Sequence, residues 1–255
     1  MPVVRACAPC AAPLTTHVSS SKKSVTSKNV AISETALAYL KESSGMKNMV
    51  FKPAALAAEW TLVANPGCAA ASNMHRLAKD AKNLGELAAL PGKGVETGQK
   101  LVTFIQTPSL YTFGDVLNKV CDFFVPFADV VKTVSDKISP LGRRAAQMLS
   151  LTAAGALVTT MSFGTLEELG KIEQAEKAAA KGRQSKVYAE AQAVNSLFNI
   201  IRNSSFQSLG AITLAAAVVP ISLGWPMTAL ATNGLFFTLL GHFHKKTVLE
   251  PAERV

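Results

Sequence analysis

The sequence predicts an all-α membrane protein with a C-terminal hydrophobic hairpin of two helices and a helical region before it. Three observations support this fold class. No stretch alternates between apolar and polar residues for long enough to predict a β-sheet. Hydrophobic residues make up 49% of the chain and charged residues only 17%, whereas soluble domains average roughly 25% charged residues. The apolar residues gather in a few blocks, and the longest uncharged block lies near the C-terminus.

Residues 1–30 are predicted to be a disordered, basic, Ser-rich segment. The stretch SSSKKSVTSKN at 19–29 is weakly hydrophobic, and no acidic residue precedes Glu34. An organelle transit peptide, an uncleaved bacterial secretion signal and a plain flexible tail all share this composition. The three interpretations therefore stay open.

Residues 31–205 are predicted to form a helical region. Short helical patterns run to about residue 106, and the turns NPG at 65–67 and PGKG at 91–94 separate them. Residues 112–139 then form the clearest amphipathic helix, in which Pro126 should introduce a kink. The apolar face of this helix consists of Val116, Val120, Phe124, Phe127, Val131 and Val134.

The polar face of the same helix mixes the two signs of charge. Four aspartates recur every seven residues, with lysines between them: Asp115, Asp122, Asp129 and Asp136. Helices that lie flat on membranes favour Lys and Arg on the polar face. We therefore expect the apolar face to pack against neighbouring helices, in preference to a membrane surface.

An uncharged segment of 22 residues follows at 145–166. Gly164 predicts the end of this helix, and Thr165 with Glu168 predicts a capping box that starts the next one. The next helix carries two acid–lysine pairs four residues apart, a spacing that places them on one helix face. The pairs are Glu167–Lys171 and Glu173–Lys177.

The C-terminal block is uncharged over 39 residues, from 203 to 241. As a single helix it would be about 58 Å long at 1.5 Å per residue, nearly twice the roughly 30 Å of a bilayer core. A turn is therefore predicted near its middle. The residues that indicate this turn are Pro220, Gly224, Trp225 and Pro226.

The turn divides the block into two predicted helices, 206–223 and 227–243, followed by a polar tail at 244–255. Trp225 would lie at headgroup depth at the hairpin tip. Each helix has a face of small residues, through which two membrane helices can approach closely. These predicted contact residues are Gly210, Thr213 and Ala217 in the first helix, expected to face the second, and Ala231, Gly234, Thr238 and Gly241 in the second.

Two alternatives qualify the membrane hairpin. The block also contains Thr and Asn, so a buried hairpin in a soluble Ala-rich bundle stays open. Segment 145–166 is long enough to span as well, but it would place Arg143 and Arg144 opposite the other basic residues, against the positive-inside tendency. We therefore expect only the hairpin to be embedded, with 1–205 and the tail facing the cytosol.

No arrangement of residues predicts chemistry. Cys7 and Cys10 have metal or redox spacing but lack a second pair, and PGKGVETGQK at 91–100 lacks the spacing of a phosphate-binding loop. No catalytic, cofactor-binding or metal-ligating residue is predicted, and the protein is not expected to be an enzyme. The net charge is +9, but the interleaved aromatic and basic residues of a nucleic-acid binder are missing.

The plan resembles that of chlamydial inclusion membrane proteins. The features that carry the resemblance are SSSKKSVTSKN, the two hydrophobic lobes and the turn LGWP at 223–226. The resemblance implies type III secretion, insertion into the vacuole membrane and binding of host factors. A weaker resemblance, on GDVLNKVCDFF and HFHKK, is to the peroxisomal membrane-elongation peroxins.

We therefore expect an integral, multi-pass membrane protein that recruits or scaffolds partners. Its partners would be the lipid bilayer and unidentified proteins, host or self, with no cofactor. A membrane-shaping protein of organelles, a small transporter or channel subunit and a soluble helical-bundle effector are the alternatives. The uncharged lobes argue against a transport path.

Overall fold

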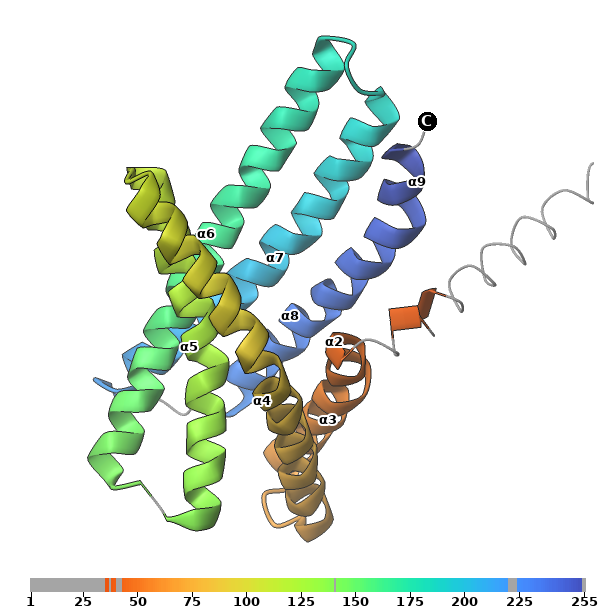
Figure 1. Cartoon of the computed structure of the whole chain (residues 1–255). Coiled ribbons are helices and arrows are strands. Elements are labelled where there is room, and N and C mark those ends of the chain that lie inside the picture. The colour runs from red at the N-terminus through yellow and green to blue at the C-terminus, as the bar shows by residue number, and fades with distance from the viewer. Residues whose placement is uncertain (1–34, 37, 40–42, 140, 220–223, 254–255) are drawn as a thin grey trace, which may run out of the picture.

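The computed structural model describes residues 35, 36, 38, 39, 43–139, 141–219 and 224–253, and every regular element in these ranges is a helix (Figure 1). The all-helical prediction is confirmed. The elements are α2 (Ser43–Met46), the π-helical turn η1 (Lys47–Phe51), α3 (Lys52–Ala64), α4 (Ala69–Gln106), α5 (Leu110–Ile138), α6 (Arg143–Ala180), α7 (Lys186–Ala216), α8 (Gly224–His244), the π-helical turn η2 (Lys245–Leu249) and α9 (Glu250–Glu253). The predicted N-terminal segment and Pro220 lie outside the described residues.

The long helices form antiparallel pairs. α4 and α5 make one hairpin, and α6 and α7 make a second (Figure 1). α8 runs antiparallel to α7 on the side away from α6, and α3 packs against both α4 and α8. The chain therefore brings α3 to α8 together around one central region, from which the α4–α5 and α6–α7 ends project.

Local sequence explains several helix ends. At the start of α5, the Ser109 hydroxyl accepts from the Thr112 N–H, and the Thr112 hydroxyl accepts from the Ser109 N–H. Ser185 caps α7 in a similar way by accepting from the Tyr188 N–H. Between α6 and α7, Gly182 has a φ of 66°, a left-handed conformation that glycine adopts without steric cost.

Several predicted boundaries are wrong. α4 continues through the PGKG stretch with Pro91 inside the helix, and α6 continues through Gly164 and Thr165. Thr165 bonds to the Met161 carbonyl of its own helix, so it caps nothing. At Gly164 the helix approaches Asn203 of α7 so closely that a Cβ would lie 2.8 Å from the Asn203 amide nitrogen. Tertiary packing therefore overrides the local stop signal.

The predicted limits of the hairpin also move. α7 begins at Lys186 and passes without interruption through residue 206, where the hydrophobic lobe was expected to start. The expected polar tail continues α8 as helix, and Leu249 and Ala252 pack on Ala191 and Tyr188 of α7. The Glu167–Lys171 and Glu173–Lys177 ion pairs are confirmed.

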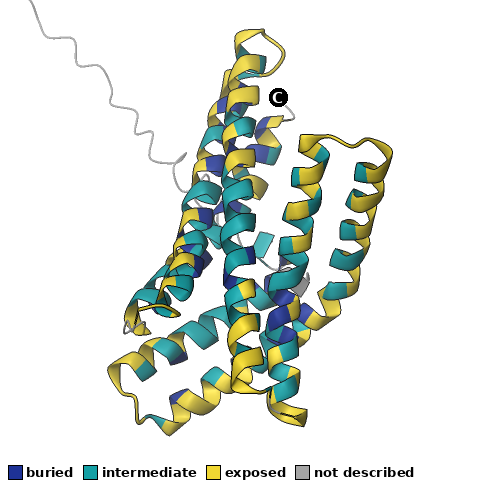
Figure 2. Ribbon diagram, turned by 90° about the vertical axis from the view of Figure 1, so that its left-hand side faces the viewer, coloured by how far each residue is buried: buried dark blue, intermediate teal, exposed yellow. Residues whose placement is uncertain are grey.

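The interior is made of small and polar side chains. Of the 14 buried hydrophobic residues in the described part of the chain, ten are alanines. The other four are Tyr39, Val130, Leu235 and Leu249. Ten polar or charged residues are buried as well, and Ser196 and Asn203 are the most enclosed, at 0% and 1% exposure. Figure 2 shows the buried positions as narrow stripes along the helices, with no single large core.

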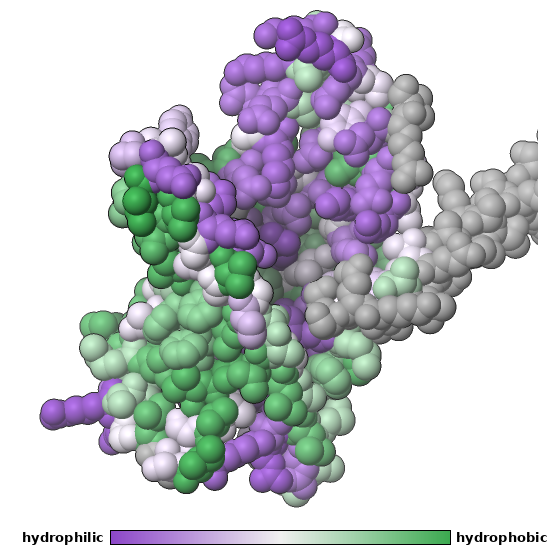
Figure 3. All heavy atoms as spheres, viewed as in Figure 1, coloured by the Kyte–Doolittle hydropathy of each residue, from purple (hydrophilic) through white to green (hydrophobic). Residues whose placement is uncertain are grey.

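Large apolar side chains lie outside. Thirty-one of them are exposed, against the four that are buried. On the face shown in Figure 3, apolar residues gather over the lower half of the molecule, and polar residues cover the upper ends of α6, α7 and α9. Each of α6 and α7 therefore has an apolar half, which lies in the lower part of the molecule, and a polar half, which lies in the upper part.

Candidate functional site

The residues predicted to form the hairpin tip lie at the start of α8. Gly224, Trp225 and Pro226 are its first three residues, so they belong to the helix and the prediction that they form the turn is corrected. Proline suits a first helical turn because the backbone N–H it lacks would have no acceptor there. Trp225 is 65% exposed, which leaves its ring free at this end of the molecule.

The glycines of α8 allow close contact with α7. A Cβ on Gly234 would lie 2.7 Å from the ring of Phe206, and one on Gly241 would lie 3.2 Å from the Asn199 side-chain oxygen. Thr238 bonds to the Gly234 carbonyl within α8. The two helices are therefore held at a distance that larger side chains would not permit.

Gly210 of α7 faces α6, which corrects its expected pairing with the small residues of α8. A Cβ on Gly210 would lie 2.8 Å from Val158 and 2.9 Å from the Ala154 carbonyl oxygen. α7 lies between α6 and α8, and Gly210 makes its close contact with α6 and not with α8. Of the remaining predicted contact residues, Thr213 and Ala231 line a central cleft and Ala217 is exposed.

Polar side chains connect the apolar halves of the helices. The Gln207 amide donates to the Ser162 hydroxyl across α6 and α7 at 3.0 Å. The Asn233 amide donates to the Ser205 hydroxyl across α7 and α8 at 2.7 Å, and the Trp60 indole donates to Thr232 across α3 and α8 at 3.1 Å. Small residues combined with interhelical hydrogen bonds are the usual means by which helices associate in lipid.

Ion pairs fill the seam between α4 and α5. The heptad-spaced Asp115, Asp122 and Asp129 meet lysines of α4 at 2.7, 2.8 and 2.9 Å. Two further pairs extend the same antiparallel register. The complete set is Lys100–Asp115, Lys119–Glu96, Lys93–Asp122, Lys82–Asp129 and Lys137–Asp80. The polar face of α5 is thus the face that packs.

The apolar face of α5 is therefore left largely open, against the expectation that it would pack in the interior. Val120, Phe127 and Val134 are exposed, and Val116, Phe124 and Val131 are only partly buried. The residues of α5 that are buried are Pro126, Ala128 and Val130. The physical reason is that the aspartates of α5 form ion pairs with lysines of α4. The polar face of α5 therefore lies against α4, and the neighbouring apolar face is directed outward.

A cleft of about 590 Å³ lies between α3, α4, α5, α6, α7 and α8. Its charged lining comes from α3, α4 and α5 and includes Lys52, Glu59, Lys82, Glu86, Asp129 and Lys132. Its apolar lining comes mainly from α6, α7 and α8. Burial, with the nearby charges of Lys47 and Lys82, lowers the pKa of Lys52 to about 7. No feature of the sequence singles out this lysine.

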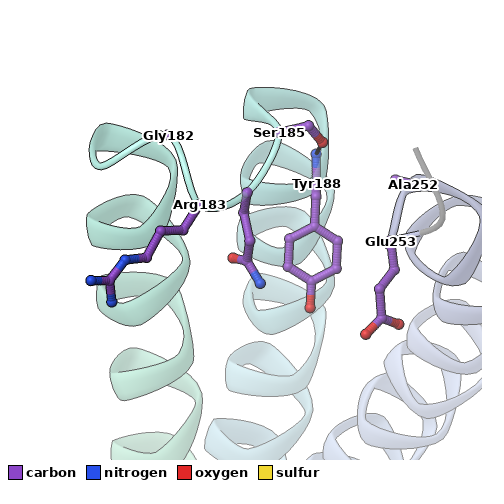
Figure 4. A pocket seen from close by; sticks show the side chains of 7 residues that line it. Gly182, Arg183, Ser185, Tyr188, Ala252 and Glu253 are labelled. Carbon is purple, nitrogen blue, oxygen red and sulfur yellow. Dashed lines mark hydrogen bonds between the residues drawn. The ribbon is translucent and has the colours of Figure 1, made fainter.

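A smaller polar depression of about 360 Å³ lies at the other end, between the α6–α7 turn and α9. In Figure 4, Arg183 points away from Tyr188 and Glu253, so the charged groups do not converge. Ser185 already serves as the helix cap.

Reactive groups do not gather elsewhere in the described ranges. No three His, Cys, Asp or Glu side chains among them could hold a metal ion together. Cys68 and Cys121 are free thiols, and burial raises the pKa of Cys121, which disfavours its thiolate. Cys7 and Cys10 lie outside the described residues.

By length and composition, α6 is the single helix in the described part of the chain that could cross a membrane. The sequence predicted that the two helices of the C-terminal hairpin span the membrane and that 145–166 does not. By length and composition, the candidate span is instead the helix that contains 145–166. The reason is that α7 carries polar residues such as Asn203 and Gln207 into its apolar half, and α8 carries Asn233 in its middle. Comparison with protein-family models, curated proteins and solved structures found no match to this chain.

Proposed function

We propose that the protein is a helical membrane protein, anchored through α6 and the adjoining apolar halves of α7 and α8, that recruits protein partners to the membrane. The distribution of side chains is the main support. The described interior is built from alanine, glycine, serine and asparagine, while large apolar residues lie outside. In water-soluble proteins the large apolar side chains are preferentially buried, so this arrangement is the reverse of the usual one.

The energetic argument is direct. In water, burying a large apolar side chain contributes about 1.5–3 kcal/mol, and only four such residues are buried in the described ranges. In lipid that contribution is not needed between helices, because the acyl chains solvate apolar side chains equally well. Close packing at Gly210 and Gly234 and the Asn233–Ser205 hydrogen bond then hold the helices together.

Helix length supports the same anchor. Residues 145–166 of α6 would cover roughly 33 Å at 1.5 Å per residue, close to the roughly 30 Å of a bilayer core. Arg143 and Arg144 precede this stretch, and Glu167 and Glu168 follow it. α7 and α8 accompany it, because Gly210 packs on Ala154 and Phe206 packs on Gly234. The polar ends of α6 and α7 would project into the aqueous phase.

Partner recruitment is assigned to the exposed apolar face of α5, which runs alongside the apolar half of α6 and would meet its partners at the depth of the anchor. This face is not needed for packing with α4, because the ion pairs of Asp115, Asp122 and Asp129 occupy that seam. A place in a pathogen vacuole membrane, as the resemblance to inclusion membrane proteins implies, is the narrower form of the proposal. It rests on the hydrophobic lobes and the N-terminal composition alone.

Carbonate extraction tests the anchor. The double variant Thr152→Lys/Phe236→Lys adds charge to two exposed positions in the apolar halves of α6 and α8. A lysine at the centre of a span costs about 2.5–3.5 kcal/mol, so the variant should move from the membrane pellet to the soluble fraction. The matched control, Leu169→Lys/Val187→Lys, adds the same charge to exposed positions in the polar halves. It should stay in the pellet.

Extraction of the wild-type chain by carbonate, or equal behaviour of the two double variants, would refute the anchor. Recruitment is tested separately with Val120→Asp/Phe127→Asp and proximity labelling in cells. Proteins labelled near the wild-type chain should be lost. An unchanged labelling profile would refute the assignment to α5.

A further inference from the structure

The central cleft has one charged end and one apolar end. The charged groups belong to α3, α4 and α5, whereas the apolar end is lined by Leu149, Leu157, Met161, Phe206, Leu209 and Leu235. Its volume of about 590 Å³ lies within the range of roughly 300–1,000 Å³ found for small-molecule sites. A molecule that fills it would contact charged groups of α3, α4 and α5 and apolar side chains of α6, α7 and α8.

The acids at the charged end already have basic partners. Glu86 is bridged by Lys47 at 3.5 Å and by Lys82 at 3.7 Å. Lys82 also bonds to Asp129 at 2.9 Å, and Glu59 meets His75 at the same distance. Each acid that lines the cleft therefore already has a basic side chain beside it, although the Oε2 atom of Glu86 has no hydrogen-bond partner within the described ranges.

Two lysines at the same end have no ion-pair partner within the described ranges. They are Lys52 at the start of α3 and Lys132 on α5. The charged groups around Lys52, from all the elements packed against it, are Lys47, Glu59, Lys82, Glu86, Asp129, Lys132 and Arg202. The cleft lining itself has three lysines and three carboxylates, and the nearby Lys47 and Arg202 give the surroundings of Lys52 a surplus of positive charge.

The low pKa of Lys52, about 7, agrees with this count. Loss of hydration is the largest cause of this low pKa, the charges of Lys47, Lys82 and Arg202 lower it further, and the carboxylate of Glu86 offsets only part of the effect. An anion at this place would supply the missing counter-charge and would raise the pKa again. Binding should therefore weaken as the pH rises above neutrality.

From the cleft shape and the unpaired lysines, we propose that the cleft binds one single-chain amphiphile with an anionic head, such as a fatty acid. The head lies beside Lys52 and Lys132, and the chain extends along α6, α7 and α8. A free fatty acid and a lysophospholipid with an acidic phosphate share this chemistry. The apolar lining of the cleft belongs to the same halves of α6, α7 and α8 as the proposed anchor, but this proposal concerns binding of a ligand and goes beyond insertion into a membrane.

Photo-crosslinking tests the proposal with the full chain in nanodiscs of neutral phosphatidylcholine. The probe is a palmitate analogue with a diazirine in its chain, and peptide mass spectrometry locates the crosslinks. We expect labels on the cleft side of α6, α7 and α8 near Leu157, Leu209 and Leu235. Unlabelled palmitate should compete, whereas hexadecanol and hexadecylamine should compete at least roughly tenfold less, because charge-assisted bonds are the strong ones.

The variant Lys52→Gln/Lys132→Gln should lower the labelling about tenfold, and Lys52→Arg should retain it. The matched control is Lys79→Gln, an exposed lysine of α4 that does not line the cleft. Competition by lysophosphatidic acid, compared with palmitate, identifies which head the site prefers. Equal competition by hexadecylamine, or labels confined to side chains outside the cleft, would overturn the proposal. The competition uses wild-type protein and does not depend on the folding of any variant.

Discussion

Replacing Lys52 with methionine should stabilise the folded protein, and the gain should depend on pH. The pKa of Lys52 falls from 10.5 to about 7 on folding, so the unfolded chain binds one more proton than the folded chain between these values. Stability of the wild type therefore rises with pH across this window. Methionine has a similar length and no charge, so it removes the dependence.

The magnitude follows from the same values. At about 1.4 kcal/mol per pH unit, the difference between 10.5 and about 7 corresponds to a penalty of at most about 5 kcal/mol below neutral pH. The gain for Lys52→Met should be largest at pH 6, should shrink through the window and should vanish above about pH 10.5.

Chemical unfolding followed by circular dichroism at 222 nm, in a neutral detergent at pH 6 and pH 10, measures this difference. Lys79→Met serves as the control, because Lys79 is exposed on α4 and should give little change at either pH. An equal free-energy change for Lys52→Met at both pH values would refute the reasoning. So would destabilisation at pH 6.

Two further predictions concern packing and ion pairs. Gly234→Ala should destabilise the protein by about 1–3 kcal/mol, because the added methyl would meet the Phe206 ring at 2.7 Å; Gly98→Ala, whose added methyl meets nothing within 4 Å, should be neutral or stabilise by up to about 1 kcal/mol. Thermal unfolding measures both variants, and midpoints of Gly234→Ala and Gly98→Ala that shift in the same direction would contradict the close contact between Gly234 and Phe206. Asp122→Asn should cost no more than about 1 kcal/mol, because Lys93 and Asp122 are both partly exposed. The exchange Asp122→Lys/Lys93→Asp should recover most of that loss, and failure to recover it in a double-mutant cycle would count against the pairing.

The helical class could be predicted from periodicity, but the direction in which faces point could not. The heptad spacing of Asp115, Asp122 and Asp129 is visible in the sequence. Their partners Lys100, Lys93 and Lys82 lie on another helix, and only the antiparallel register of α4 and α5 brings them together. A sequence pattern identifies an apolar stripe, but tertiary neighbours decide whether it is covered.

The predicted helix boundaries were wrong for a related reason. Pro91 and Gly164 are strong local signals for an end, yet α4 and α6 pass through them. Local propensities of about 1–3 kcal/mol are outweighed when a long helix packs along its whole length against another. The cleft could not be predicted for a different reason. In the sequence, nothing distinguishes Lys52 from the other Lys and Arg residues, 26 in all, and only the fold places it in one cleft with Lys82 and Glu86.

The charged end of the cleft limits how the apolar halves can be embedded. Lys52 and Lys82 line the same cleft as Leu209 and Leu235, so ionisable groups lie beside the proposed anchor. Charged groups at such depth are tolerated when they face the protein interior and are paired, and Glu86 and Asp129 meet this condition. Lys52 does not, so an anionic amphiphile would remove the remaining cost. The anchor and the cleft therefore predict opposite effects for one substitution: Lys52→Met should raise stability without ligand and should reduce the further stabilisation by palmitate.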